Sequence, residues 1–249
     1  MQSSLPAFIQ GASRGIGAGI VEQLLTRGQT VFASSRAPER SEGLARLKAA
    51  HGDRLHLLTV DVTEDATVEA AAALVRATTE RLGLVMNVAG LLHDGDRRPE
   101  RRVEEIDAAW LHRTYAVNAV GPLLVAKHFA PLLKHHDGSV LANVSARVGS
   151  IEDDRLGGWY GYRASKAAQN MFTKNLSIEL TRRFPSLVVI ALHPGTVATN
   201  LSAPFQRGVP EGKLFSVERA ASQLLSIVDG ATPEDNGRFF AWDGSPIPW

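Results

Sequence analysis

Short apolar runs alternate along the chain with longer segments in which apolar residues recur at helical spacing. The short runs lack polar alternation, which is typical of strands buried on both faces of a sheet. They predict strands at residues 7–9, 30–33, 55–60, 84–88, 139–144 and 187–192, with an edge strand at 237–242. The longer segments predict helices at residues 15–27, 41–50, 64–81, 103–115, 119–133, 161–182 and 217–228. Pro131 is expected to break the fifth of these helices.

Alternation of strands and helices predicts an α/β fold, in which helices cover both faces of a mostly parallel sheet. Because crossovers between parallel strands are right-handed, the sheet is expected to be doubly wound, a Rossmann fold of about seven strands. The sequence contains no repeat, low-complexity tract or linker. We therefore expect residues 1–249 to form a single domain.

Composition and charge exclude several classes of protein. With 44% hydrophobic residues, 21% charged residues and a net charge of +1, the chain is globular and suits neither nucleic acid nor an anionic membrane as a partner. The basic stretch at residues 97–102 contains Pro and Glu but no aromatic residue, and we interpret it as a solvated loop. The first residues do not resemble a leader, and no window approaches ~18 consecutive apolar residues. We expect no membrane span and a cytoplasmic protein.

The sequence gives no support for metal or hydrolase chemistry. It has no cysteine, which excludes disulfides, thiolate catalysis and Cys-ligated metal ions. The histidines are scattered without metal-ligand spacing, so no metal site is expected. The GxSxG motif of a serine hydrolase elbow is absent.

A glycine-rich loop, Gln10-Gly11-Ala12-Ser13-Arg14-Gly15-Ile16-Gly17, joins the first strand to the first helix. Glycines allow a tight turn and a close backbone approach to a pyrophosphate, and the amino end of the helix supplies free N–H groups. The spacing is GxxxGxG rather than GxGxxG. An ordinary turn is the alternative, but the place of the loop favours a dinucleotide site. Its expected contacts are Gly11, Ser13, Arg14, Gly15, Ile16 and Gly17.

The end of the second strand indicates which dinucleotide would bind. A carboxylate about 20 residues beyond the loop would bind the ribose of NAD, but this chain has Arg36 there. Arg14 adds a second cation, and a guanidinium can bind the additional phosphate of NADP through two hydrogen bonds. Either arginine alone could be a surface charge, whereas the two together favour NADP(H) over NAD(H).

Tyr162 and Lys166 are the candidate catalytic pair, and their spacing of four places both side chains on one face of a helix. A cation ~4 Å from a phenol favours the phenolate by about 4 kcal/mol at an effective dielectric of ~20. We therefore expect Lys166 to lower the pKa of Tyr162, against the opposing effect of desolvation. The alternative interpretation is an ordinary Tyr–Lys pair on a helix surface.

The glycine loop and the Tyr162–Lys166 pair, together with the motifs between and after them, resemble those of the short-chain dehydrogenase/reductase family. The resemblance covers nearly the whole chain. The resemblance also includes Asp61-Val62, Asn87-Val88-Ala89-Gly90, Asn118, Ser145 and Pro194-Gly195. Residues 149–166 and 237–249 resemble the sniffer/C-factor carbonyl reductases, as does the long gap between Ser145 and Tyr162. Gln10 and Val88 depart from the pattern of the family without removing a catalytic group.

The resemblance implies a role for each of these residues. Tyr162 would donate the proton in carbonyl reduction, and Lys166 would also bind the nicotinamide ribose. Ser145 would donate a hydrogen bond to the substrate oxygen, where negative charge develops, and Asn118 would hold a water in a proton relay. The other implied cofactor contacts are Asp61 and Val62 at the adenine, Asn87, Ala89 and Gly90 at the ribose and phosphates, and Pro194, Gly195, Val197 and Thr199 at the nicotinamide and pyrophosphate.

The expected function is NADPH-dependent reduction of an aldehyde, ketone or quinone to an alcohol. Residues 200–215 are rich in Pro and Gly and are expected to form a flap over the substrate, with a long surface loop as the alternative. A signalling or scaffold protein of C-factor type, which binds NADP(H) without turnover, is the alternative function. The resemblance further implies a homodimer or homotetramer. Candidates for the substrate wall are Arg147, Ile151, Trp159 and Phe205.

Overall fold

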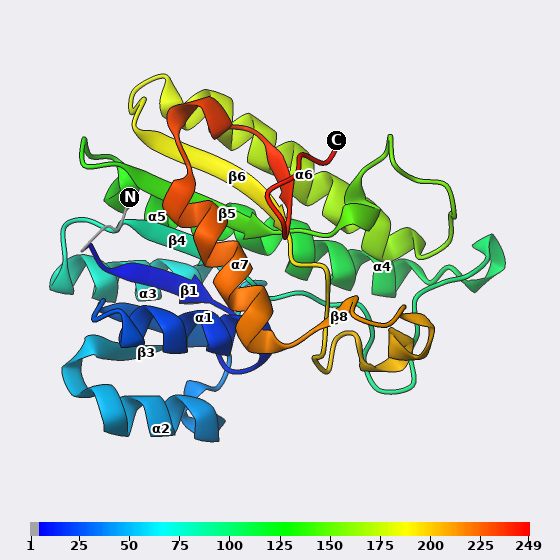
Figure 1. Ribbon diagram of the computed structural model, residues 1–249, viewed down its shortest axis with the longest axis horizontal. Coiled ribbons are helices and arrows are strands. Elements are labelled where there is room, and N and C mark those ends of the chain that lie inside the picture. The colour runs from blue at the N-terminus through cyan, green and yellow to red at the C-terminus, as the bar shows by residue number, and fades with distance from the viewer. Residues whose placement is uncertain (1–4) are drawn as a thin grey trace.

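The computed structural model describes residues 5–249 and contains one parallel sheet of seven strands. The strand order is β3-β2-β1-β4-β5-β6-β9, and all six strand pairs are parallel (Figure 1). The strands are β1 (Ala7–Gln10), β2 (Val31–Ser35), β3 (Leu55–Thr59), β4 (Leu84–Asn87), β5 (Ser139–Val144), β6 (Leu187–His193) and β9 (Phe239–Ala241). The predicted doubly wound α/β fold is confirmed.

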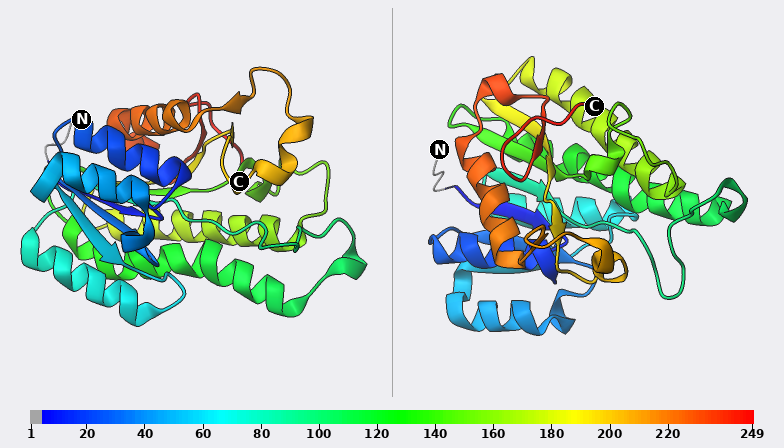
Figure 2. Two further views of the ribbon diagram at one scale, coloured as in Figure 1. Left: turned by 90° about the horizontal axis from the view of Figure 1, so that it is seen from below. Right: turned by 45° about the vertical axis from the view of Figure 1, so that its right-hand side comes forward.

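Helices cover both faces of this sheet, as the left view of Figure 2 shows. The α-helices are α1 (Gly15–Thr26), α2 (Glu42–His51), α3 (Asp65–Thr78), α4 (Ala108–Tyr115), α5 (Gly121–Leu133), α6 (Tyr160–Thr181) and α7 (Val217–Gly230). One apolar core lies between the sheet and α1, α2 and α7, and a second lies between the sheet and α3, α5 and α6. Because both faces are buried, the strands are mostly apolar and do not alternate between apolar and polar residues; most of their polar residues stand near the strand ends.

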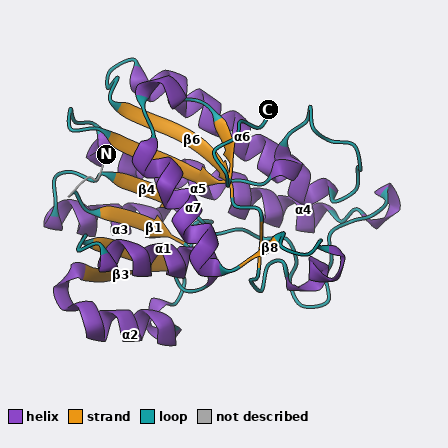
Figure 3. Ribbon diagram, in the orientation of Figure 1, coloured by secondary structure: helices purple, strands orange, loops and turns teal. Residues whose placement is uncertain are grey.

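The order of the strands reverses between β1 and β4, where the chain begins to build the second half of the sheet. In open parallel sheets, ligands bind beyond the carboxyl ends of the strands at this switch point. The long loops gather at that end of the sheet, which lies on the right in Figure 3. The fold therefore brings the glycine loop and the segments after β4, β5 and β6 to one edge.

The helix predicted at residues 103–115 begins later than expected. Val103–Glu105 forms only a 3-10 turn, and α4 starts after Asp107, whose side chain accepts a hydrogen bond from Trp110 N at 2.8 Å. An aspartate in this position satisfies an amide that the first helical turn leaves unpaired, and it fixes the start of the helix.

The predicted break at Pro131 is wrong, because α5 continues through Pro131 to Leu133. Proline removes one backbone hydrogen bond, but α5 ends two residues later, where Leu132 and Leu133 are buried in the core. Tertiary packing therefore holds this last turn.

The continuous helical segment Ala108–Leu133 contains an 18-residue stretch with a mean hydropathy of 1.3, long and apolar enough to cross a membrane by length and composition alone. More than half of it is buried inside the protein. Val125, Phe129 and Leu133 pack in the core beside the sheet, as expected for a core helix.

One small sheet was not predicted. β7 (Thr196–Val197) pairs in parallel with β8 (Leu214–Phe215), and the two strands enclose the segment expected to form the flap. Strands of two residues are too short for an apolar pattern to reveal them.

Candidate functional site

Close backbone contacts explain the glycines of the loop between β1 and α1. Gly11 has a φ of 81°, and a Cβ there would lie 2.5 Å from the backbone nitrogen of Ala89. A Cβ on Gly17 would lie 2.2 Å from the carbonyl oxygen of Gly11. Side chains have no room at these positions, so the loop presents its backbone at the switch point of the sheet.

The amino end of α1 is suited to an anion. Its N-cap residue, Arg14, has an extended backbone and makes no side-chain cap hydrogen bond, and the first turn contains no acidic residue. The amino end of a helix carries unpaired N–H groups and about half a positive charge. With the tight glycine cradle beside it, this geometry fits the pyrophosphate of a dinucleotide.

Arg36 follows the end of β2 and is exposed, close enough to Asp61 for its charge to act on that carboxyl group. Burial by itself would raise the pKa of Asp61, but hydrogen bonds from Thr63 and the charge of Arg36 hold the pKa below its ordinary value. The guanidinium and this carboxylate thus lie together at the outer rim of the predicted nucleotide site. Val62 is buried and packs against Gly121.

Two of the predicted catalytic residues lie on one face of α6, and a third reaches the same helix from the loop after β5. Tyr162 and Lys166 are both buried, and the Lys166 Nζ lies 5.9 Å from the centre of the Tyr162 ring. Ser145 follows β5 and reaches the same helix, where its Oγ donates to the Oδ1 of Asn170 at 2.7 Å. The interpretation of Tyr162 and Lys166 as an ordinary surface pair is therefore wrong.

Lys166 makes two hydrogen bonds within the protein. Its Nζ donates to Val144 O and to the Oε1 of Gln169, both at 2.9 Å. Gly90 lies beside it, because a Cβ on Gly90 would be 3.9 Å from the Lys166 Nζ. Desolvation lowers the pKa of Lys166 to about 7, so its charge is readily changed near neutrality.

Burial raises the pKa of Tyr162 above its ordinary value. This differs from the expectation that Lys166 lowers it. The difference has a physical cause: desolvation of the phenolate dominates, while the ammonium is directed to Val144 O and Gln169 rather than to the phenol oxygen. The phenol consequently keeps its proton at neutral pH.

Asn118 lies in a π-helical turn, Ala116–Val120, between α4 and α5. Its Oδ1 accepts from Leu91 N at 2.7 Å, and its Nδ2 donates to Leu91 O and to the Oγ of Ser165. Ser165 in turn donates to the backbone oxygen of Tyr162. The side chain of Asn118 therefore links the segment after β4 to α6. Both hydrogens of its amide group are donated in its two hydrogen bonds to Leu91 O and Ser165.

Asn87 is buried at the end of β4. Its Nδ2 donates to the Oδ1 of Asn143 on the neighbouring strand at 2.8 Å, while its own Oδ1 has no hydrogen-bond partner among the described residues. Gln10, which replaces the usual residue of the family, has a clear role instead: its Oε1 accepts from Ala89 N at 3.0 Å. It holds the segment after β4 against the glycine loop.

The segment after β6 closes the site from the other side. A Cβ on Gly15 would lie 3.2 Å from the Cγ2 of Thr199, so this threonine reaches the glycine loop. Gly195 has a φ of 75°, and a Cβ there would lie 2.6 Å from the Phe215 ring. Pro194 and Val197 are buried. The residues predicted after β6 are thus brought to the same edge as those after β1.

The predicted flap contacts the site through aromatic rings. Phe205 lies 4.9 Å from Trp159 and 6.2 Å from His93 between ring centres, and Trp159 lies 6.3 Å from Tyr162. Two candidates for the substrate wall, Trp159 and Phe205, are therefore neighbours beside Tyr162. Ile151 is 79% exposed, and it is not enclosed in a pocket.

The sequence predicted a solvated loop at residues 97–102, but part of this stretch is buried. Glu100 is buried, its Oε2 accepts from Gly161 N at 3.1 Å, and its backbone oxygen accepts from Trp159 N at 2.5 Å. Trp159 has a φ of 52°, the only positive φ of a non-glycine among residues 5–249. Glu100, which lies in the loop after β4, thus caps the amino end of α6.

Sequence reasoning missed four residues of this region: Gln10, Glu100, Gln169 and Asn170. The helical period could have revealed Asn170, since it lies four residues beyond Lys166 and hence on the same face. Nothing in the local sequence marks Glu100, because it stands in a stretch with Arg98, Arg101 and Arg102 that has the composition of a surface loop.

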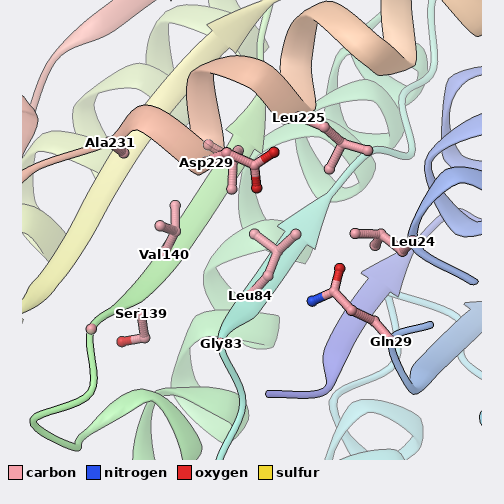
Figure 4. A pocket seen from close by; sticks show the side chains of 11 residues that line it. Leu24, Gln29, Gly83, Leu84, Ser139, Val140, Leu225, Asp229 and Ala231 are labelled. Atoms are coloured by element: carbon pink, nitrogen blue, oxygen red, sulfur yellow. The ribbon is translucent and has the colours of Figure 1, made fainter. Parts of the chain in front are cut away.

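A small cavity lies away from these residues, at the amino ends of β4 and β5 (Figure 4). Leu24, Leu84, Val140 and Leu225 line it, together with Gln29 and Asp229. It is on the opposite edge of the sheet from the glycine loop and has no part in the site. Among residues 5–249, no group of three or more His, Asp or Glu side chains could hold a metal ion.

Comparison with known proteins finds consistent relatives. Residues 6–209 match the short chain dehydrogenase family. The chain is 34% identical over 242 residues to 1-hydroxy-2-glutathionyl-2-methyl-3-butene dehydrogenase of Rhodococcus sp. (strain AD45), which covers 97% of this chain and 98% of that protein. It is also 37% identical over 145 residues to C-signal of Myxococcus xanthus, over 58% of this chain and 82% of that protein.

Two solved structures have the same fold along almost the whole chain. The NADPH-bound carbonyl reductase from chicken fatty liver superposes with a TM-score of 0.87 at 29% identity, over 98% of this chain and 94% of that one. Carbonyl reductase Sniffer of D. melanogaster superposes with a TM-score of 0.86 at 28% identity, over 98% of this chain and 99% of that one.

Proposed function

Because this chain belongs to the short-chain dehydrogenase/reductase family of oxidoreductases, we propose that it reduces a carbonyl compound to an alcohol with NADPH. The observation that carries the proposal is the shared burial of Tyr162 and Lys166 on the face of α6 that Ser145 also reaches. A phenol that keeps its proton, next to a hydroxyl and an ammonium, can protonate an oxygen that acquires negative charge.

NADP(H) is the cofactor that the nucleotide end suits best. The backbone of the glycine loop and the amino end of α1 would hold the pyrophosphate, and Arg14 and Arg36 would hold the additional phosphate. Asp61 would lie at the adenine, and Thr199 would lie between the pyrophosphate and the nicotinamide. When bound, the nicotinamide supplies the hydride. The NADPH-bound relative supports this assignment.

The protein's own groups would handle the proton. Tyr162 would donate its phenolic hydrogen to the substrate oxygen as the carbonyl carbon is reduced. Lys166, whose pKa of about 7 in the buried site lies well below that of Tyr162, would then return a proton to the phenolate in a downhill step. Residues 200–215 would close over the substrate, since Phe205 already lies against Trp159 next to the phenol.

A signalling protein that binds NADP(H) without turnover is the second candidate, and the similarity to C-signal favours it. Binding of the dinucleotide alone does not require Tyr162 or Ser145. Their shared burial beside Lys166 therefore favours an enzyme.

The test follows NADPH oxidation by the purified protein with 4-nitrobenzaldehyde, an aliphatic ketone and a quinone. Tyr162→Phe is expected to lower kcat by about 10²–10⁴-fold, the usual contribution of a general acid, with the NADPH Kd unchanged. Tyr160→Phe is the matched control, because Tyr160 is half exposed and has Ala164 rather than a lysine four residues on. Normal turnover by Tyr162→Phe would refute the assignment of Tyr162 as the proton donor. Tight NADPH binding without oxidation of any of the three substrates would favour the signalling role.

A further inference from the structure

Asn170 lies one helical turn beyond Lys166 and is buried on the same face of α6. Its Oδ1 accepts from the Oγ of Ser145 at 2.7 Å, and its Nδ2 donates to Gly149 O at 3.2 Å. Ser145 is buried as well. This amide therefore connects a candidate catalytic hydroxyl to the turn that follows β5.

The orientation of the Asn170 amide follows from its two partners. A backbone carbonyl oxygen can only accept, so the NH₂ group must face Gly149 O. The amide oxygen must then face Ser145, and it too can only accept. Ser145 has one hydroxyl hydrogen, and that hydrogen is consequently donated to Asn170.

The surrounding backbone holds this arrangement in place. A Cβ on Gly149 would lie 2.7 Å from the Cβ of Lys166 and 2.9 Å from its backbone carbon, so the turn packs directly on α6. The backbone N–H of Ser145 donates to Leu192 O on β6 at 2.8 Å. Neither the serine nor the amide can move away without disturbing the sheet or the helix.

We propose that Asn170 is a positioning residue for the reaction and that it controls the hydrogen of Ser145. In the resting protein, the Ser145 oxygen presents only its lone pairs to the site. To donate to a substrate oxygen, Ser145 must turn its hydrogen away from Asn170. A neutral carbonyl gains little from this exchange, whereas an oxygen with developing negative charge forms a hydrogen bond roughly twice as strong. Until that exchange, Asn170 holds the Ser145 hydroxyl in one position, so that it is preorganised where the negative charge develops, which raises kcat.

This inference rests on the proposed carbonyl reduction and is tested by a double-mutant cycle with NADPH and 4-nitrobenzaldehyde. Asn170→Leu keeps the approximate volume and removes both hydrogen bonds. We expect it to lower kcat about tenfold, with the KM for the aldehyde unchanged or lower and the NADPH Kd unchanged. If Asn170 acts through Ser145, the pair Ser145→Ala with Asn170→Leu has a kcat/KM within about twofold of that of Ser145→Ala alone.

Ser177→Ala is the control for a buried polar change on the same helix, since Ser177 is buried and donates only to Lys174 O. We expect it to have ordinary kinetics. A further tenfold loss in the double variant, or an Asn170→Leu variant that behaves like Ser177→Ala, would overturn the inference. If the unmutated protein oxidises NADPH with none of the three carbonyl compounds, the proposed function itself fails, which separates the two results.

A neutron structure of the unmutated protein with NADPH gives a second readout that depends neither on activity nor on the folding of a variant. The expected result is a deuterium on the Ser145 Oγ that points to the Oδ1 of Asn170. A deuterium that points into the substrate site, away from Asn170, would contradict the inference.

Discussion

The carboxylate of Glu100 and the backbone N–H of Gly161 are 61 residues apart in the chain and meet at 3.1 Å at the amino end of α6. Gly161 leaves the space for this contact, because a Cβ there would lie 3.1 Å from the Oε1 of Glu100. The N-cap residue of α6 is Trp159, whose side chain makes no capping hydrogen bond. The loop after β4 therefore fixes where the helix that carries Tyr162 begins.

Removal of this cap is expected to destabilise the protein. Glu100→Ala leaves the buried amide of Gly161 without its acceptor and should lower the free energy of unfolding by about 1–2 kcal/mol, the usual range for a lost helix cap. Glu100→Gln retains an acceptor oxygen and should lose less than half of that. Urea denaturation at neutral pH measures both values. Equal stability of Glu100→Ala and the unmutated protein would show that the contact does not stabilise the helix.

Substitution of Gly11 should damage the nucleotide site directly. Gly11→Ala would place its Cβ 2.5 Å from the backbone of Ala89 at a φ of 81°, and neither backbone can yield easily. We expect at least a tenfold weaker NADPH Kd by fluorescence titration, together with a lower Tm. Gly43→Ala, in α2 with the nearest atom 3.9 Å away, is the control and should be neutral or stabilising. Unchanged NADPH binding by Gly11→Ala would mean that the loop does not form the cradle.

Reversal of the charge at Arg36 should change the choice of cofactor. Arg36→Asp removes a phosphate-binding guanidinium and places a second carboxylate near Asp61, so it should repel the additional phosphate of NADPH. We expect the ratio of kcat/KM for NADPH to that for NADH to fall at least tenfold. Arg40→Asp makes the same charge change at a highly exposed side chain nearby and serves as the control. An equal ratio in the Arg36 variant and the unmutated protein would remove Arg36 from the phosphate site.

The buried lysine should make stability depend on pH. In the unfolded chain Lys166 keeps its proton up to a pKa near 10.5, whereas the folded site releases it above about 7. Between these values the unfolded state binds more protons, so a rise in pH favours the folded state, by up to about 1.4 kcal/mol per pH unit. The stability contribution is complete above pH 10.5 and is lost as the pH falls to about 7.

Lys166→Met keeps the length of this side chain without the charge, and it should lack this part of the pH dependence. Urea denaturation of both proteins from pH 7 to pH 10 measures the difference. Parallel stability curves for the two proteins would show that Lys166 keeps its proton in the folded state.

The apolar runs placed the first six strands of the sheet correctly, because strands covered on both faces need a mostly apolar sequence. The edge strand at Phe239–Ala241 also lies within its predicted range. Helix boundaries were less accurate where a single side chain decides them, as Asp107 does for α4. The membership of the family, and its likeness to Sniffer-type carbonyl reductases, are confirmed by the relatives.

The motifs that follow the carboxyl ends of the strands could be assigned to one site from the sequence. The reason is that the carboxyl ends of parallel strands all lie at the same edge of the sheet. The contacts of a side chain there were not predictable, such as the hydrogen bond from Asn87 to Asn143 on the neighbouring strand. Contacts between distant segments, such as Glu100 with Gly161, leave no local pattern in the sequence. The raised pKa of Tyr162 depends on burial, which only the folded structure fixes.

The most direct test of the central claim is a crystal structure of the protein saturated with NADPH. We expect the pyrophosphate to lie on the glycine loop at the amino end of α1. We expect the nicotinamide C4 to face the substrate space, with the Tyr162 hydroxyl within about 3–4 Å of the same space. A glycine loop without bound dinucleotide, or a nicotinamide ring remote from Tyr162, would contradict it.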